Sequence, residues 1–128
     1  MSKVEIRTDD APAPPARFSQ GVRKGNILQV AGQVAFDAAT GSVVGTTVAE
    51  QTRQTFSNVE AVLKAGGASL ADVVMLRVFL TDVSHFAEMN GVWDSVFAGV
   101  EAPPARTTVY VGLPAGLLVE IDALAVLD

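Results

Sequence analysis

The chain has 128 residues, a formal net charge of −5 and no cysteine. This length predicts one domain over residues 1–128, large enough to bury a core without crosslinks. The lack of cysteine excludes disulfides, thiolate metal sites and cysteine nucleophiles, and the negative charge opposes binding to the phosphates of nucleic acid.

No apolar run approaches the roughly 18 residues that a membrane-spanning helix needs. The first residues also lack the apolar centre of a secretion signal. With no requirement for an oxidising compartment, the sequence predicts a cytoplasmic protein without a membrane partner.

The first quarter of the chain has the pattern of three strands. Residues 4–8 alternate between apolar and polar side chains, which is the period of a strand. Residues 21–24 and 27–36 predict two more strands, joined at Gly25 and Asn26, because these residue types suit a hairpin turn. We expect a loop after them, over residues 37–45.

A helix is predicted between Thr47 and Gly66. Thr47 and Glu50 have the spacing of a capping box, in which each side chain accepts a hydrogen bond from the other residue's backbone. Gly66 and Gly67 are expected to end the helix. Its buried stripe is predicted to contain Thr52, Thr55, Phe56, Val59, Val62 and Leu63.

The second half predicts a strand, a helix and two final strands. Residues 73–80 form an apolar and β-branched run typical of a covered strand. A second helix is expected to follow, capped by Asp82 or Ser84. The last strands are predicted over residues 106–112 and 119–126. The apolar stripe of the second helix contains Phe86, Met89, Trp93, Val96 and Phe97.

This order of elements predicts an α+β fold in which two helices cover one face of a six-stranded sheet. The last strand also has apolar residues at both alternating positions, including Leu124 and Val126 on the side away from the helices. Since no third helix is available to cover that side, we expect another copy of the chain to do so.

Arg106 and Glu120 are the candidate functional residues, because charged side chains are costly to bury in apolar strands. An arginine offers a fork of donors that fits a carboxylate, and burial can raise the pKa of a glutamate toward the range useful for proton transfer. Together they suggest a site for a small carboxylate substrate. The alternative is a structural Arg106–Glu120 ion pair between neighbouring strands.

Short motifs in a characteristic order are spread along the chain, from about Ala16 to Val126. They are Ala31-Gly32-Gln33, Glu50-Gln51-Thr52-Arg53-Gln54 with Asn58, Val78-Phe79-Leu80-Thr81-Asp82, Asn90, Pro104-Ala105-Arg106, Leu113-Pro114, and Val119-Glu120-Ile121-Asp122-Ala123-Leu124-Ala125. In their order and spacing these motifs resemble the RidA/YjgF family. That resemblance implies a chorismate-mutase-like fold (βββαβαββ), and a homotrimer with a barrel-like core and active sites between subunits.

The resemblance also implies an activity. Archetypal members hydrolyse reactive 2-enamine and 2-imino acids, such as 2-aminoacrylate and 2-iminobutanoate, to 2-keto acids and ammonia, and need no cofactor. By resemblance, Arg106 grips the substrate carboxylate and Glu120 positions or activates the attacking water. Gly32, Asn90 and Thr108 match substrate-binding positions of the family.

Two further substrate-binding positions depart from the family pattern. Phe18 stands where archetypal deaminases usually have a tyrosine, and Ala31 stands where a serine is common. The pocket is therefore expected to be more apolar, which could reduce imine hydrolysis or redirect it to a bulkier imino acid.

Other functions remain open from the sequence. A relative without deaminase activity could bind small carboxylates or act as a holdase-like chaperone, which would need an exposed apolar patch. Some relatives are described as endoribonucleases, but the acidic charge and the lack of clustered cations disfavour RNA here. With one histidine and no cysteine, a tight metal site is not expected.

Overall fold

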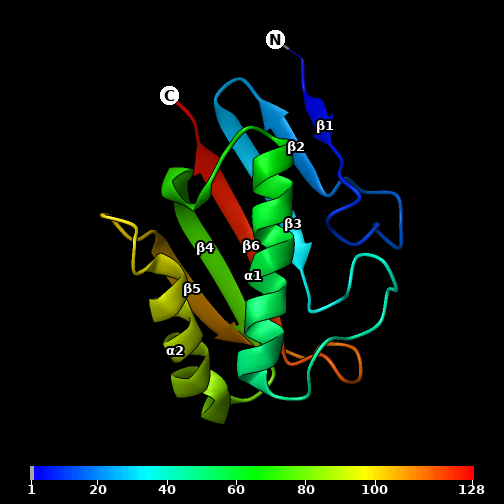
Figure 1. The fold of residues 1–128 in the computed structure, drawn as a ribbon, viewed down its shortest axis with the longest axis vertical. Coiled ribbons are helices and arrows are strands. Elements are labelled where there is room, and N and C mark those ends of the chain that lie inside the picture. The colour runs from blue at the N-terminus through cyan, green and yellow to red at the C-terminus, as the bar shows by residue number, and fades with distance from the viewer. Residues whose placement is uncertain (1) are drawn as a thin grey trace.

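A computed structural model describes residues 2–128 as a six-stranded sheet with two α-helices packed on one face (Figure 1). The order of elements is the predicted one, which confirms the α+β class. Short 3₁₀ helices precede the fourth strand and the second helix, at Leu70–Asp72 and Val83–His85. The elements are β1 (Val4–Ile6), β2 (Gly21–Lys24), β3 (Ile27–Gln33), α1 (Val48–Ala65), β4 (Val73–Leu80), α2 (Phe86–Phe97), β5 (Ala105–Tyr110) and β6 (Val119–Val126).

The last strand lies in the middle of the sheet. The strand order is β1-β2-β3-β6-β4-β5, with β4 and β5 parallel and every other neighbouring pair antiparallel. Therefore β6 is paired on both sides, while β5 forms an edge and is separated from β6 by β4. This arrangement decides which functional side chains can meet.

Helix α1 begins and ends where its sequence predicts. The Thr47 hydroxyl accepts a hydrogen bond from the Glu50 N–H at 3.2 Å, and the Glu50 carboxylate accepts one from the Thr47 N–H at 3.1 Å. The helix ends before Gly66, and Gly67 has a φ of 84° that a side chain would disfavour. Every residue of its predicted stripe is buried.

Four predicted boundaries are wrong. Strand β1 ends at Ile6 rather than at residue 8. Asp82 caps the short 3₁₀ helix Val83–His85 by accepting from the Ser84 N–H, so neither Asp82 nor Ser84 caps α2, which begins at Phe86. Strand β3 has a register shift with β6 between Val30 and Gln33 and ends at Gln33 rather than at residue 36. Strand β5 likewise ends at Tyr110 rather than at residue 112.

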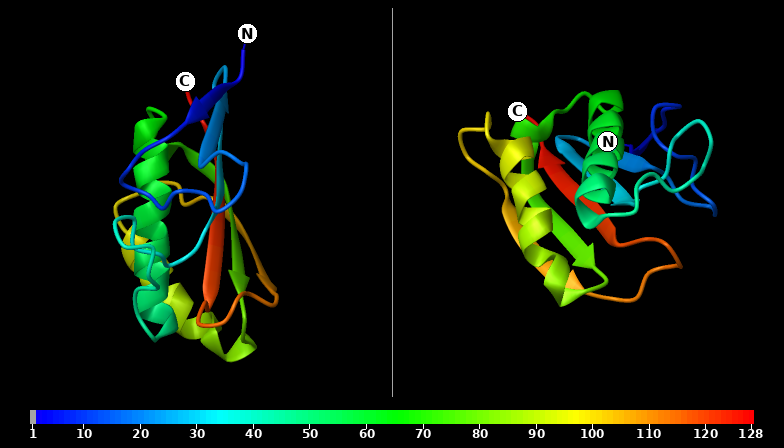
Figure 2. Two further views of the ribbon diagram at one scale, coloured as in Figure 1. Left: turned by 90° about the vertical axis from the view of Figure 1, so that its right-hand side faces the viewer. Right: turned by 60° about the horizontal axis from the view of Figure 1, so that its bottom comes forward.

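The two faces of the sheet differ in their cover. Both helices lie on one side, as the edge-on view in Figure 2 shows, and bury β6 residues such as Ile121 and Ala123 completely. The other side, called the open face here, exposes the paired Ile27 and Val126, together with Val109 of β5. Neither helix within residues 2–128 has the length and hydropathy needed to cross a membrane.

Candidate functional site

Glu120 lies on the open face of β6, directly against the backbone of Gly32 in β3. A Cβ atom at Gly32 would come within 2.5 Å of the Glu120 Oε2 and 2.9 Å of its Cδ. No side chain fits between the two strands at this point while the carboxylate keeps its place. The missing side chain of Gly32 therefore leaves room for the Glu120 carboxylate.

The Glu120 carboxylate borders a hollow of about 650 Å³. The hollow lies between the N-terminal connection, the loop that follows β3 and the loop that precedes β6. Apolar side chains dominate its wall, and the half-exposed Phe18 is one of them. Its lining includes Phe18, Gly32, Phe36, Pro114, Leu117 and Glu120.

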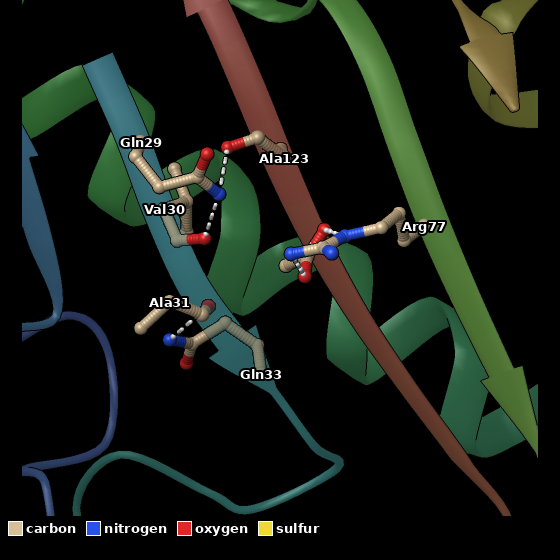
Figure 3. Close-up of polar contacts among 7 residues, drawn as sticks. Gln29, Val30, Ala31, Gln33, Arg77 and Ala123 are labelled. Atoms are coloured by element: carbon tan, nitrogen blue, oxygen red, sulfur yellow. Dashed lines mark hydrogen bonds and ion pairs between the residues drawn. The ribbon is translucent and has the colours of Figure 1, made fainter. Parts of the chain in front are cut away.

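Burial raises the pKa of the Glu120 carboxyl, and the nearby charge of Asp122 raises it further. Asp122 itself is paired: Arg77 on β4 approaches it at 2.7 Å and donates a second hydrogen bond at 3.0 Å. Figure 3 shows Arg77 reaching from β4 across β6. Glu120 has no ion pair within residues 2–128 that would lower its pKa, so the effect of burial is not offset by a neighbouring cation.

Side-chain amides bridge the backbone near this face of β3. In Figure 3, Gln29 donates to the carbonyl oxygens of Val30 and Ala123, which links β3 to β6, and Gln33 donates to Ala31. The Ala31 N–H also donates to the carbonyl of Gln20 at 2.9 Å. The backbone on both sides of Gly32 is therefore held in place. Within residues 2–128, Ala31 is not among the residues that line the hollow.

Arg106 lies on the other face of the sheet, under α2. Its Cζ atom lies over two aromatic rings of that helix, 4.7 Å from the centre of Trp93 and 5.4 Å from the centre of Phe86. The guanidinium makes no hydrogen bond and no ion pair within residues 2–128. Its five N–H donors thus remain available to a carboxylate ligand.

Two predicted binding residues lie on the same side as Arg106. Thr108 follows Arg106 by two residues along β5, so both side chains point to the helix side. Asn90 is one turn after Phe86 and one turn before Trp93 on α2. The Asn90 Oδ1 and the Thr108 Oγ1 are buried without a hydrogen-bond partner in the described chain, and such atoms usually find one in a bound ligand or water.

The predicted residues thus form two groups rather than one site. Arg106 is in register with Leu76 of β4 and Glu120 with Phe79, and positions three apart on a strand face opposite ways. The Arg106–Glu120 ion pair considered from the sequence is therefore wrong for the single chain, since β4 also separates their strands.

Sequence reasoning missed the neighbours of both charged groups. It assigned Trp93 and Phe86 only to the helix core, whereas they also contact Arg106, and Phe86 is 38% exposed. It did not single out the Arg77–Asp122 pair either. No group of three or more histidine, aspartate or glutamate residues among residues 2–128 is arranged to hold a metal ion.

A family model described as Endoribonuclease L-PSP matches residues 8–127. A RutC family protein of Pyrococcus horikoshii is 43% identical, over 96% of this chain and 97% of the relative. The 2-iminobutanoate/2-iminopropanoate deaminase of Escherichia coli K12 is 39% identical, over 98% of both chains. These matches cover nearly the whole sequence.

The fold agrees with a solved member as well. The crystal structure of the YjgF gene product of Escherichia coli has a TM-score of 0.90 and 38% identity, over 96% of this chain and 98% of that one. The chain belongs to the RidA/YjgF family.

Proposed function

We propose that this chain is a cofactor-independent deaminase that hydrolyses reactive 2-enamine and 2-imino acids to 2-keto acids and ammonia. The observation that carries the proposal is the Arg106 guanidinium, which has no hydrogen bond or ion pair within residues 2–128. Two polar side chains without hydrogen-bond partners, Asn90 and Thr108, lie on the same side of the sheet. The name of the Escherichia coli relative supports this substrate class. On this proposal, the physiological substrate is an imino acid such as 2-iminobutanoate.

Arg106 binds the substrate carboxylate with two parallel hydrogen bonds, which also orient the adjacent C=N group. The unpartnered Thr108 hydroxyl can donate a hydrogen bond to the same carboxylate, and the unpartnered Asn90 Oδ1 can accept one from the substrate N–H. The anionic end of the substrate is thereby fixed, and C2 faces the attacking water.

Glu120 supplies the proton transfers. The ionised carboxylate accepts a proton from water while the water oxygen bonds to C2, and Glu120 passes that proton to the imine nitrogen, which has taken up the electrons of the C=N bond. In the tetrahedral intermediate, Glu120 then accepts the proton of the new hydroxyl as the C=O bond forms, and returns it to the leaving nitrogen as the C–N bond breaks. One water is consumed, ammonia leaves, and the 2-keto acid remains bound through its carboxylate. The raised pKa of Glu120 suits a group that must both accept and return a proton.

Both groups can face one substrate only if different copies of the chain supply them. We propose a homotrimer in which the Glu120 hollow of one subunit adjoins the Arg106 face of the next. The exposed apolar side chains of the open face, Ile27, Val109 and Val126, support burial against other copies. Light scattering at micromolar concentration should give about 40 kDa, three times the mass of one 13.3 kDa chain, and a monomer would contradict the trimer.

The decisive test measures ammonia and 2-ketobutyrate released from freshly generated 2-iminobutanoate, above the rate in water. Arg106→Ala should abolish the acceleration while the circular dichroism spectrum and the subunit number stay unchanged. Lys64→Ala, on the exposed last turn of α1, is the matched control and should keep full activity. If the unaltered protein gives no acceleration with any small imino acid, the deaminase proposal fails.

A second candidate is a carboxylate-binding protein without turnover. Phe18 favours it, because this residue borders the hollow yet has no hydroxyl to orient water. Binding of 2-ketobutyrate without any acceleration would support this candidate. Ribonuclease activity, to which the name of the family model refers, is disfavoured by the net charge of −5.

A further inference from the structure

We infer that Trp93 and Phe86 form an aromatic clamp that positions the Arg106 guanidinium for a carboxylate ligand. The inference rests on the proposed role of Arg106 as the carboxylate anchor and adds two residues that determine its geometry. Both ring contacts, at 4.7 and 5.4 Å from the Cζ atom, are within the roughly 6 Å range of cation–π attraction.

The spacing of the two rings on α2 creates the clamp. Phe86 and Trp93 are seven residues apart, which places their Cα atoms on one face of the helix, about 10.5 Å apart along its axis. Arg106 enters between them from β5, the edge strand. Contact with one ring alone would leave a long side chain free to turn about its χ angles, whereas two rings confine it.

The Trp93 ring is itself fixed by the core. It packs against Phe97 with ring centres 4.6 Å apart and against Phe56 with centres 6.1 Å apart. Trp93 is only 8% exposed, and Phe56 of α1 is 1% exposed. The position of Arg106 is therefore set by the packing of both helices, although the arginine lies on an edge strand.

Unlike an ion pair, a clamp of aromatic rings leaves the N–H donors of the guanidinium free for a ligand. A carboxylate partner would occupy the guanidinium donors and compete with the ligand, whereas aromatic rings use none of them. The rings also replace water around the cation, which strengthens its attraction for a carboxylate. Glu101, the nearest acidic residue before Arg106 in the sequence, is exposed and forms no ion pair within the described chain.

The test measures binding of 2-ketobutyrate, an unreactive carboxylate probe, by isothermal titration calorimetry. Phe86→Leu and Trp93→Leu should each weaken binding about five- to tenfold, in line with the loss of one desolvated cation–π contact. Trp93→Phe keeps a ring face and should retain most of the affinity. Val83→Ala is the control, because Val83 is 68% exposed just before α2 and should change nothing.

Turnover adds a second measure. In the clamp variants KM for the imino acid should rise more than kcat falls, because the clamp acts on the carboxylate and not on the C=N bond. Since Trp93 is also core, Trp93→Leu could unfold the chain, and then the exposed Phe86→Leu decides. If Phe86→Leu and every folded Trp93 variant bind 2-ketobutyrate as tightly as the unaltered protein, the clamp is overturned.

The clamp and the deaminase proposal can fail separately. Tight 2-ketobutyrate binding that Phe86→Leu weakens, without any deamination, would sustain the clamp and refute the enzyme. Full deamination by the unaltered protein, together with unchanged 2-ketobutyrate binding in the clamp variants, would support the enzyme and refute the clamp. No measurable binding of 2-ketobutyrate to the unaltered protein would overturn the clamp and the anchor role of Arg106 together.

Discussion

Arg106 and Glu120 lie on opposite faces of the sheet, on strands that β4 separates. One copy of the chain therefore cannot direct both side chains at a single small substrate. Each copy instead presents an Arg106 face under α2 and a Glu120 hollow against Gly32. On the proposed function, two such half-sites form one complete site where two copies meet.

This division predicts that inactive variants can complement each other. Copies with Arg106→Ala keep an intact Glu120, and copies with Glu120→Gln keep an intact Arg106. Refolding equal amounts together should restore about a quarter of the unaltered activity, because one in four interfaces of a randomly mixed trimer pairs the two intact residues. The measurement is ammonia release from 2-iminobutanoate after refolding. Mixtures that stay as inactive as either variant alone would show that one copy supplies both residues.

Gly32→Ala should abolish turnover without unfolding the chain. The new Cβ would lie 2.5 Å from the Glu120 Oε2, so the flexible end of the glutamate must move and the carboxylate leaves its place. We expect a loss on the order of 10²-fold or more in kcat, comparable to removing a positioned base. Gly99→Ala is the matched control, because nothing lies within 4 Å of its added Cβ. An active Gly32→Ala protein would mean that the position of Glu120 does not matter.

The fold was largely predictable because its signals are local. The capping box at Thr47 and Glu50 sets the start of α1, and the strand β6 follows from its run of strand-forming residues. The start of α2 was not predictable from its cap, since Asp82 caps a 3₁₀ turn that shares the same sequence signal. Local patterns do not distinguish the two kinds of helix over one turn.

The arrangement of the site was less predictable, because it depends on strand order and register. Nothing local to residues 106–112 and 119–126 indicates that β4 lies between them, so a single site or an ion pair formed by Arg106 and Glu120 looked reasonable. The raised pKa of Glu120 was predictable in direction, since burial in a strand suffices. The contact of Trp93 with Arg106 joins a helix to an edge strand and required the tertiary structure.

Asp122→Asn should shift the acidic limb of the pH–rate profile to lower pH. The charge of Asp122 contributes to the raised pKa of Glu120, so its removal lets Glu120 ionise at lower pH. If ionised Glu120 is the base, kcat/KM is then retained further into the acidic range. Arg77→Gln should shift the limb the other way, because it leaves Asp122 unneutralised. If both variants give the same pH–rate profile, ionisation of Glu120 does not determine the acidic limb.

Phe18→Tyr should raise kcat/KM for small imino acids by about two- to tenfold, the net worth of one hydrogen bond. Phe18 is 50% exposed and borders the hollow, so an added hydroxyl can reach water or substrate there without a burial cost. Phe18→Leu removes the ring without adding a hydroxyl and should bring no gain. A drop in activity on Phe18→Tyr would indicate that this chain prefers a larger, more apolar substrate.

Glu120→Gln should lower kcat by on the order of 10²–10⁴ and leave 2-ketobutyrate affinity nearly unchanged, since it removes a base without changing the shape of the hollow.

The same variant should be more stable at neutral pH. The folded state raises the pKa of Glu120, so the original chain loses stability as pH rises through that pKa, and an uncharged glutamine does not. Thermal unfolding should therefore give equal melting temperatures for both proteins in acid and a higher one for Glu120→Gln near pH 7. A variant that is fully active, or less stable at every pH, would make Glu120 a structural residue.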